Sequence, residues 1–352
     1  MKQLIPDNLE PGMVLADTVF AANGRVLLAE GTKLTQDLIE RLKEMQILTV
    51  FINDENTISV DPDDVLINRV HSEALQVLGH FLPADIFGER LGSVKDRYDS
   101  LSGILGEVVK DEKVANLYLD LRTIDDDTLN HSINVCVLSL IMGDVFKMDR
   151  ERQLQLGKAA MVHDIGKKAV PQDIIAKRED RTPEEAKIFE DHTKHGYQIL
   201  REAEFDVGIA RAALYHHERW DGSGYISKVA GENIDLFSRI IAVADVYDDV
   251  TRGISYKQKY LPHEAMEFLY GAGNIYFDAR VVKAFTGSIF AYPLGSIVKL
   301  STGEIGIVIN VQKTMAPRPI VKVFYDKANN RLDYPRQVDL SEQKTLFITK
   351  IL

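Results

Sequence analysis

Cysteine is nearly absent from this chain of 352 residues, because Cys136 is the only one. A single cysteine excludes an intramolecular disulfide framework and fits a reducing compartment. Long hydrophobic runs are also absent. The longest, at 135–142, is far shorter than the roughly 20 apolar residues that a membrane-spanning helix needs. The first residues, Met-Lys-Gln-Leu-Ile-Pro, lack the apolar stretch of a secretory signal. These absences predict a cytoplasmic protein that does not associate with membranes.

Basic residues are in deficit, since 42 Lys and Arg stand against 53 Asp and Glu for a net charge of −11. An acidic surface argues against broad binding of DNA polymers, RNA polymers or anionic membranes. It leaves room for a small anionic ligand that metals hold in a pocket. The composition, 45% hydrophobic and 27% charged, is ordinary for a globular protein, and the length predicts two or three domains.

Residues 1–60 predict a small α+β module of unknown role. Asn23-Gly24 is a favoured hairpin turn, and it lies between two short apolar runs. A helical pattern and a β-like run follow, while no catalytic residue type clusters here. The two hairpin strands, the helix and the last strand are expected at 13–15, 26–28, 38–45 and 48–52.

Two further regions flank the centre of the chain. Residues 61–120 carry apolar side chains at helical spacing, which predicts connecting helices that pack within the chain rather than forming a dimer seam. Residues 289–352 are rich in β-branched runs and predict a small β-rich module. Its strands are expected at 296–300, 306–311, 321–325 and 345–351.

Residues 121–288 show helical periodicity almost throughout. The predicted fold class is therefore mainly α, with an all-helical core between an N-terminal α+β module and a C-terminal β module. The helices of this core are expected at 131–146, 152–163, 184–200, 207–217, 236–251 and 263–270.

Histidine and aspartate recur in this core at spacings that suit one metal centre. Asp127 and His131 are four residues apart and so share a helix face. His163 and Asp164 are adjacent, so they can serve one metal together only at a helix end or a distortion, or they can serve two neighbouring metals. Gly166 supports the helix end. The candidate ligands are Asp127, His131, His163, Asp164, His192, His216, His217 and Asp245.

Taken one at a time, the candidates differ in how strongly the sequence indicates a metal ligand. A lone histidine is more often a surface or hydrogen-bonded residue than a ligand. Asp245 follows an apolar run, where a carboxylate is costly unless it is paired or metal-bound. Asp127 ends an acidic run that could simply favour a helix start.

The joint set indicates more than one metal ion, because it exceeds what one ion needs. A mixture of nitrogen and oxygen ligands favours iron, manganese or zinc over magnesium or calcium. Two metals about 3.5–4 Å apart can activate a water and stabilise an in-line displacement at phosphorus. Lys167 follows His163 by four residues and could stabilise charge on a phosphate, although an ordinary solvated lysine is the alternative.

Two motifs carry a resemblance to a known family. The segments His163-Asp164-Ile-Gly-Lys167 and His216-His217-Glu-Arg-Trp-Asp-Gly-Ser-Gly-Tyr225 closely resemble the HD-GYP subgroup of the HD phosphohydrolase superfamily. Supporting matches include Ala-Asp245-Val-Tyr-Asp. The resemblance covers about 121–287, in matching order and spacing.

The resemblance implies an all-helical catalytic domain with two or three divalent metal ions, usually iron or manganese. It implies hydrolysis of cyclic di-GMP to linear pGpG and often to GMP. Asp164 would bridge two metals and act in catalysis, and Lys167 would be the phosphate-side lysine. Asp127 stands where three-metal members commonly carry Glu. The implied metal ligands are the eight candidates from Asp127 to Asp245 named above.

The chain departs from the family pattern at two places. Ile226 replaces the proline of Gly-Tyr-Pro, which should soften that loop without removing a ligand. Ile254 stands where an arginine usually grips substrate phosphate, and its loss predicts weaker binding. Lys257 falls on a basic phosphate-contact position, and Arg252 could substitute from another direction.

The leading hypothesis is a metal-dependent cyclic di-GMP phosphodiesterase. One alternative is a catalytically weak cyclic di-GMP sensor or interaction protein, and another is an HD hydrolase of a different cyclic or linear dinucleotide. A homodimer and protein partners at the Gly-Tyr-Ile loop or the terminal modules stay open.

Overall fold

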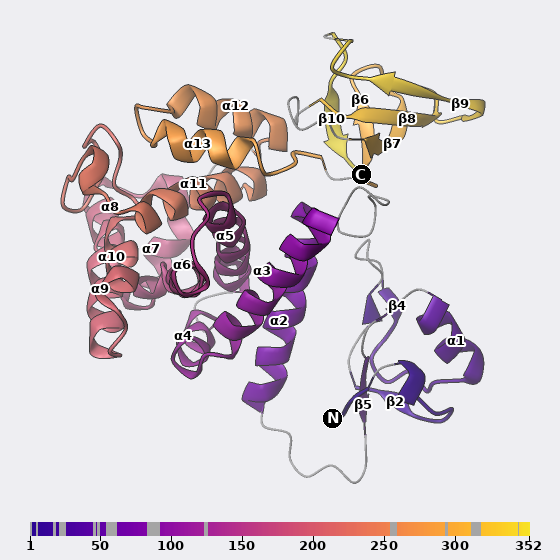
Figure 1. The fold of residues 1–352 in the computed structure, drawn as a ribbon, viewed down its shortest axis with the longest axis horizontal. Coiled ribbons are helices and arrows are strands. Elements are labelled where there is room, and N and C mark those ends of the chain that lie inside the picture. Colours follow the sequence, from indigo (N-terminus) through magenta and orange to yellow (C-terminus); the bar gives the residue numbers. More distant parts are fainter. Residues whose placement is uncertain are drawn as a thin grey trace. The chain divides into compact units, whose positions relative to one another are not determined.

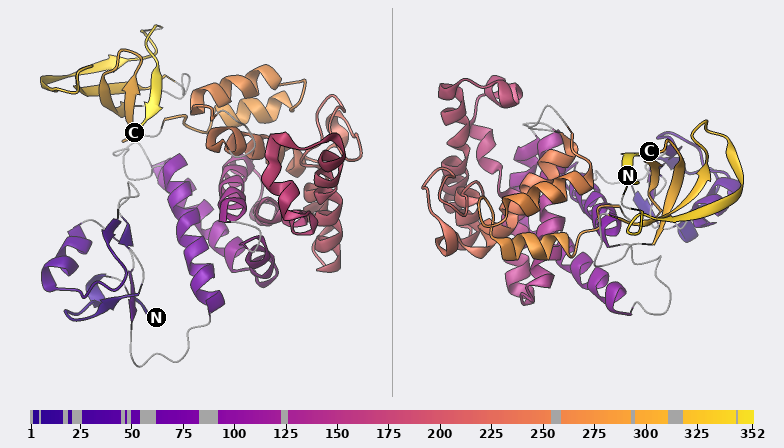
Figure 2. Two further views of the ribbon diagram at one scale, coloured as in Figure 1. Left: turned by 180° about the vertical axis from the view of Figure 1, so that it is seen from behind. Right: turned by 90° about the horizontal axis from the view of Figure 1, so that it is seen from above.

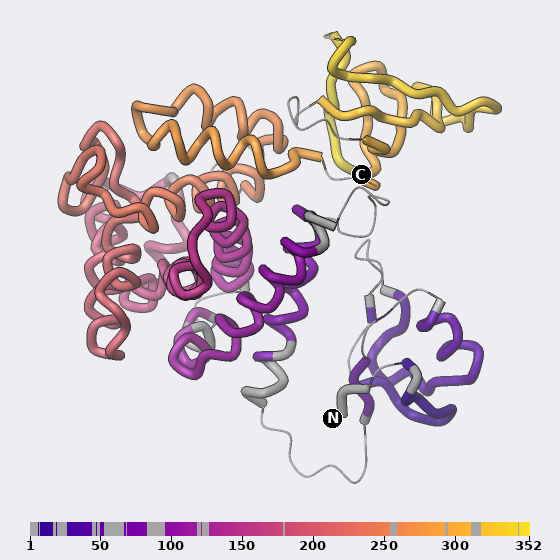
Figure 3. The backbone as a smooth tube through the Cα atoms, in the orientation of Figure 1, coloured from indigo at the N-terminus to yellow at the C-terminus, as the bar shows by residue number. Residues whose placement is uncertain are grey.

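The computed structural model has two compact units, Met1–Arg69 and Val70–Leu352 (Figure 1). Figure 3 traces the backbone of both units from the N-terminus (indigo) to the C-terminus (yellow). The described residues are 2–4, 6–16, 19–20, 26–44, 47, 50–53, 62–82, 92–122, 126–253, 259–292, 295–310, 318–343 and 345–352.

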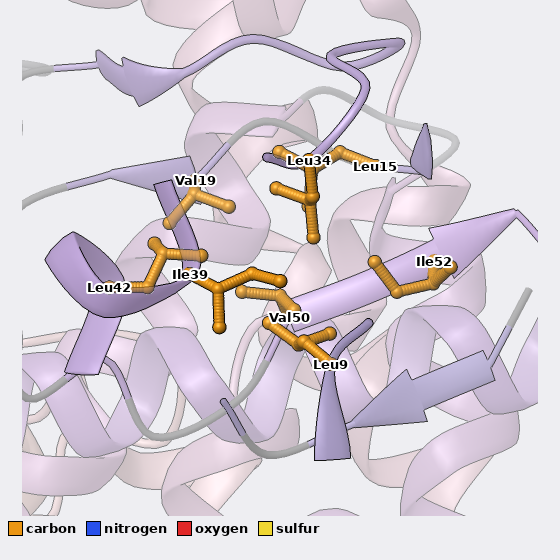
Figure 4. Packing of buried hydrophobic residues seen from close by; sticks show 8 residues of the cluster. All are labelled: Leu9, Leu15, Val19, Leu34, Ile39, Leu42, Val50 and Ile52. Atoms are coloured by element: carbon orange, nitrogen blue, oxygen red, sulfur yellow. The ribbon is translucent and has the colours of Figure 1, made fainter. Parts of the chain in front are cut away.

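The described residues of 2–53 form one α-helix and two small sheets, in agreement with the predicted α+β module. The helix α1 (Gln36–Glu44) places Ile39 and Leu42 on one face, because residues three apart are neighbours on a helix. These side chains pack with Leu15, Leu34 and others into the apolar cluster of Figure 4. The strands are β1 (Lys2–Leu4), β2 (Val14–Leu15), β3 (Val19–Phe20), β4 (Val26–Leu28) and β5 (Val50–Asn53).

The predicted hairpin between 13–15 and 26–28 is wrong. Strand β2 pairs with β5 in the sheet order β1-β5-β2, and β4 pairs instead with the intervening strand β3. The β2–β5 register places Leu15 opposite Ile52, and both side chains are buried. Pairing with β5 buries the side chains of β2, and this outweighs the shorter sequence distance to β4. The turn at Asn23-Gly24 lies outside the described residues.

The described part of 62–122 forms three helices, as the 61–120 pattern predicts: α2 (Pro62–Phe81), α3 (Gly92–Lys110) and α4 (Glu112–Arg122). Leu101, Leu105 and Val108 of α3 are buried at spacings of four and three residues. This stripe packs α3 against α6 of the core.

The core is helical, in agreement with the predicted fold class (Figure 2). Helix α5 packs on both α6 and α11, while α9 packs on α10 and on the short turn η3. The core elements are α5 (Asp126–Val145), α6 (Arg150–Val162), η3 (Ile165–Ala169), α7 (Gln172–Lys177), η4 (Arg178–Asp180), α8 (Pro183–Glu190), α9 (His192–Glu202), α10 (Val207–Tyr215), η5 (Gly231–Asn233), α11 (Leu236–Arg252), α12 (Pro262–Ala272) and α13 (Ala279–Thr286).

The helix expected at 184–200 is in fact two helices, α8 and α9, that meet at Asp191. At the junction, a ring nitrogen of His192 bonds the carbonyl of Phe189, and the Thr193 hydroxyl donates to the carbonyl of Glu190. These side chains satisfy carbonyls that would otherwise continue the helical ladder. The break places His192 at the start of a new helix.

The C-terminal module is an antiparallel sheet in the order β10-β6-β7-β8-β9. The predicted strands are present, but the sequence did not indicate β9. That strand is largely exposed and contains Pro335, which is tolerated because β9 lies at the sheet edge. The strands are β6 (Ile297–Leu300), β7 (Ile305–Asn310), β8 (Ile320–Tyr325), β9 (Arg331–Asp339) and β10 (Ile348–Ile351).

Within the described segments, no helix is both long enough and apolar enough to cross a membrane.

Candidate metal centre

The adjacent pair His163 and Asp164 lies at the end of α6, where the sequence placed it. His163 is the C-cap of α6, and Asp164 precedes the turn η3 with φ −97° and ψ 7°. Gly166 then lets η3 approach α9 closely, since a Cβ at this position would lie 1.8 Å from the carbonyl oxygen of His192. This close contact brings both residues against the start of α9.

Asp164 lies between two groups of imidazoles. Its Oδ2 faces His163 Nε2 at 3.4 Å and His131 Nε2 at 3.8 Å. Its Oδ1 faces His192 Nε2 at 3.5 Å and His216 Nε2 at 3.7 Å. The two oxygens of the Asp164 carboxylate thus face different pairs of histidines.

Asp245 of α11 is the second carboxylate of the cluster. Its Oδ1 lies 2.9 Å from His131 Nε2 and 3.8 Å from His163 Nε2, and its Oδ2 lies 3.9 Å from His217 Nδ1. Two sets of ligand atoms are close enough to hold metal ions, and Asp164 belongs to both. The sets are His131, His163 and Asp164, and Asp164, His192, His216 and His217.

Three histidines share one orientation. The Nδ1 atoms of His163, His192 and His216 face the carbonyl oxygens three residues earlier, at 2.8, 2.6 and 2.9 Å. A carbonyl only accepts, so each Nδ1 carries the proton and each Nε2 of a neutral ring presents a lone pair to the cluster. This is the tautomer that a metal ligand requires.

His131 is oriented by a carboxylate instead. Its Nδ1 lies 2.7 Å from Asp248 Oδ2, and Asn134 Nδ2 donates to Asp248 Oδ1 at 2.7 Å. Sequence reasoning assigned no role to Asp248 or Asn134. Their spacing was the available signal, because each follows a candidate ligand by three residues on the same helix face.

The residues present fit divalent metal ions. His163, Asp164, His192 and His216 are essentially inaccessible to solvent. His163 Nε2 and Asp164 Oδ1 are buried with no hydrogen-bond partner, although such atoms are rarely left unsatisfied. A cation between these atoms would satisfy both. The donor set of imidazole nitrogens and carboxylate oxygens suits a divalent transition metal.

The electrostatics keep the carboxylates ionised. Burial alone would raise the pKa of Asp164, but Lys167 and His163 outweigh it and hold the pKa well below the usual range. Burial would likewise raise the pKa of Asp245, but the His131 ring at 2.9 Å and the nearby His163 ring hold the pKa well below the usual range. Both side chains are therefore anions at neutral pH.

The histidines divide into two classes. Burial lowers the pKa of His192 to about 3 and that of His217 well below the usual range, so both rings are neutral. Burial also acts against a charged His163, but Asp164 and Asp245 raise its pKa to about 9. In the metal-free cluster, a proton on His163 therefore supplies part of the positive charge that a metal would bring.

Lys167 of η3 forms an ion pair with Asp164 Oδ2, so the structure brings it to the cluster. Burial would lower the pKa of Lys167, but the Asp164 carboxylate raises it, and the side chain is cationic. Its Nζ also lies 5.8 Å from the ring centroid of Phe189.

The structure places Asp127 and Arg252 together, apart from both sets of ligand atoms. Arg252 Nη2 lies 3.2 Å from Asp127 Oδ1, and Arg252 Nη1 lies 3.5 Å from Asp248 Oδ2. The Asp127 side chain is 60% exposed. Lys257 and Ile254, the other predicted substrate positions, lie outside the described residues.

The glycine-rich loop after His217 folds back over the cluster. Glu218 accepts from the backbone N–H groups of Ser227 at 2.7 Å and Lys228 at 2.9 Å. Gly224 permits this fold, because a Cβ there would lie 2.6 Å from the Cα of Glu218. The ring of Tyr225 then lies against that of His217, with centroids 4.8 Å apart. The loop thus covers one ligand candidate with an aromatic ring.

Family models match most of the second unit. Residues 121–281 match the model described as HD domain, and residues 297–352 match a KOW domain associated with HD domain.

Several curated proteins are similar to this chain. Cyclic di-GMP phosphodiesterase PA4108 of Pseudomonas aeruginosa is 32% identical over 241 residues, which are 68% of this chain and 58% of that protein. Cyclic di-GMP phosphodiesterase response regulator RpfG of Xanthomonas campestris is 40% identical over 129 residues, 36% of this chain and 34% of that protein. The 3'3'-cGAMP-specific phosphodiesterase 2 of Vibrio cholerae is 28% identical over 174 residues, 49% of this chain and 33% of that protein.

The chain thus spans between 33% and 58% of the length of these relatives. The family-model match over 121–281 includes the residues of the His and Asp cluster. Residues 121–281 match the HD domain family, and the similarity to cyclic di-GMP phosphodiesterases supports the resemblance of this chain to the HD-GYP family.

Proposed function

We propose that this protein is a metal-dependent phosphodiesterase that hydrolyses cyclic di-GMP to linear pGpG or GMP. The observation that carries the proposal is the position of Asp164, whose two oxygens face separate pairs of imidazole nitrogens. One carboxylate between two nitrogen-rich sets is what two adjacent metal ions require. The names of PA4108 and RpfG support cyclic di-GMP as the substrate.

Seven residues would hold the metals, with iron or manganese as the proposed ions. When bound, the ions would activate water and stabilise charge that develops at phosphorus. The proposed ligands are His131, His163, Asp164, His192, His216, His217 and Asp245.

The number of ions that we propose is two. A third ion through Asp127 would have to compete with the Arg252 guanidinium, which lies 3.2 Å from the Asp127 carboxylate. Arg252 already supplies a positive charge at that place and also faces Asp248. A fixed cation disfavours a second cation at the same carboxylate.

The remaining groups of the site bind and orient substrate. The Lys167 ammonium lies beside Asp164 and would donate hydrogen bonds to a non-bridging phosphate oxygen. The loop that ends in Tyr225 covers His217 and would limit access of bulk water. With water limited, the attraction between Lys167 and the phosphate is stronger than it would be in solvent.

The test is anaerobic loading of the protein with iron(II) or manganese(II), followed by cyclic di-GMP and chromatography of products. We expect pGpG or GMP to form, with two metal ions per chain. The double variant His163→Ala and Asp164→Ala should lose bound metal and turnover together. His195→Ala is the matched control, because His195 lies on α9 one turn from His192 but in neither ligand set. Turnover that survives the double variant would contradict the site assignment.

A second candidate is the hydrolysis of another cyclic dinucleotide, favoured by the 28% identity to a 3'3'-cGAMP-specific enzyme. Competition between cyclic di-GMP and 3'3'-cGAMP in one reaction separates the two substrates. A higher kcat/KM for 3'3'-cGAMP would replace cyclic di-GMP in our proposal. Tight binding of either nucleotide without hydrolysis in metal-loaded protein would instead indicate a sensor.

A further inference from the structure

Arg181 is a cation beside the metal cluster that the sequence did not indicate. It lies between η4 and α8, and its guanidinium carbon is 3.6 Å from the ring centroid of Phe189. Its Nε donates to the carbonyl of Ile174 at 2.8 Å, and its Nη2 donates to the carbonyl of Ile175 at 3.0 Å. Stacking and the two hydrogen bonds hold the guanidinium in one orientation.

The Phe189 ring connects Arg181 to the cluster. It lies against the ring of His192 with centroids 5.0 Å apart, and Lys167 Nζ is 5.8 Å from the same centroid. His192 is a candidate ligand, and Lys167 pairs with Asp164. Arg181 and Lys167 are therefore two cations around one aromatic side chain that borders the metal site.

One acidic residue, Asp249, acts on both cations. Burial lowers the pKa of Arg181, while Tyr225, Asp249 and Glu185 act in the opposite direction. Asp249 also contributes to the raised pKa of Lys167. A guanidinium keeps its charge under such effects, so the positive charge of Arg181 is permanent.

Arg181 has donors left for a ligand. A guanidinium has five N–H groups, and the carbonyls of Ile174 and Ile175 occupy one on Nε and one on Nη2. Among the described residues, Nη1 donates no hydrogen bond. A rigid guanidinium with free, parallel N–H groups matches the oxygens of a phosphodiester.

A cyclic dinucleotide presents two phosphodiester groups. If metals and Lys167 take the one that is cleaved, the other carries a negative charge that needs a partner. We propose that Arg181 binds this second phosphodiester group and so favours cyclic dinucleotides over substrates with a single phosphodiester. The inference rests on the proposed function and assigns Arg181 to substrate binding, not to the chemical step.

The test compares two substrates in manganese-loaded, full-length protein. Cyclic di-GMP has two phosphodiester groups, and bis(4-nitrophenyl) phosphate has one. Arg181→Gln should raise KM for cyclic di-GMP by about 10- to 100-fold, the usual effect of losing a hydrogen bond to a charged group. KM for bis(4-nitrophenyl) phosphate, kcat for both substrates and metal content should not change. Arg181→Lys keeps the positive charge but lacks the planar guanidinium. Its KM for cyclic di-GMP should therefore lie between that of the wild type and that of Arg181→Gln.

Arg178→Gln is the matched control, because Arg178 is an exposed arginine only three residues earlier. It should leave both KM values unchanged. An equal loss with both substrates, or a loss of metal, would mean that Arg181 only holds the loop through Ile174 and Ile175, and would overturn the inference. An unchanged KM for cyclic di-GMP would overturn it as well.

The outcome separates this inference from the proposed function. Failure of the wild-type protein to hydrolyse cyclic di-GMP would overturn the function alone. Equilibrium binding of cyclic di-GMP to the same variants then decides the role of Arg181. A dissociation constant equal to that of the wild type in Arg181→Gln would overturn the inference, and a tenfold or greater rise would support it.

Discussion

At the scale of single residues, the predicted ligands meet with the exception of Asp127, but spacing did not predict how their rings are held. The adjacent His163 and Asp164 were expected at a helix end, and they lie at the end of α6. The partners that fix the imidazole tautomers are mostly backbone carbonyls, and no residue type marks a carbonyl in a sequence. Asp248 was missed because its contact with His131 joins helices that are far apart in the sequence.

Asp248→Asn should weaken metal binding although Asp248 is not itself a ligand candidate. The neutral amide of Asn accepts a weaker hydrogen bond from His131 Nδ1 than the Asp248 carboxylate does. The His131 ring is then less basic and becomes a poorer ligand. We expect a loss of about 10- to 100-fold in metal affinity, measured by competition with a chelator. Asp144→Asn is the control, since Asp144 pairs with Arg97 of α3. Equal affinities for the two variants would contradict the role of Asp248.

The metal-free protein should be most stable near pH 6.5. The pKa of His163 is raised to about 9, so the stability that its proton provides is complete below pH 6.5 and is lost as the pH rises toward 9. The pKa of His192 is lowered to about 3, so stability is lost as the pH falls below 6.5, where the unfolded chain binds a proton that the folded ring does not. Thermal unfolding at a series of pH values measures this. A metal-free Tm that rises steadily from neutral pH to pH 9 would contradict the assignment for His163.

At the scale of elements, periodicity predicted the helices better than the strands. The helices of the core carry long apolar stripes, whereas β3 has only two residues and β9 is mostly exposed. Such strands form because neighbouring strands and the buried core fix them, not because of their own pattern. The division between α8 and α9 was also unpredictable, because it depends on side chains that bond local carbonyls.

The close contact of η3 with α9 should not tolerate a methyl group. In Gly166→Ala the new Cβ would lie 1.8 Å from the His192 carbonyl oxygen, so the backbone must shift. We expect a loss of about 1–3 kcal/mol in the free energy of unfolding together with loss of bound metal, because His192 moves. Denaturant unfolding and metal analysis measure the two effects.

Gly103→Ala is the control for this change, because an added Cβ at Gly103 of α3 meets nothing within 4 Å. Alanine in that helix should stabilise the protein by about 0.5–1 kcal/mol. If both alanine variants behave alike, the contact at Gly166 is not what positions His192.

At the scale of the whole molecule, the order of modules could be read from composition and periodicity. The β-branched runs that follow the helical core predicted the C-terminal sheet. The domain limits at 60 and 120 stay predictions, and the compact units divide between Arg69 and Val70. This division between units lies inside the helix α2, where the helical periodicity is continuous, so the sequence pattern does not indicate it.

Removal of metal should affect one unit only. Hydrogen exchange of amides in α6 and α9 should accelerate when a chelator strips the protein, because a ligand that binds only the folded state stabilises it. Amides of α1 and β5 belong to the separate apolar core around Ile39 and Val50 and should keep their rates. Acceleration in both units to the same extent would show that they unfold together.

The shared carboxylate of Asp164 has a consequence for how the proposed centre fills. Two cations that use opposite oxygens of one anion repel each other and compete for its electron density. The second ion should therefore bind more weakly than the first, which is negative cooperativity. A protein that holds one ion would then be a populated form, and activity would report the local supply of metal as well as the supply of nucleotide.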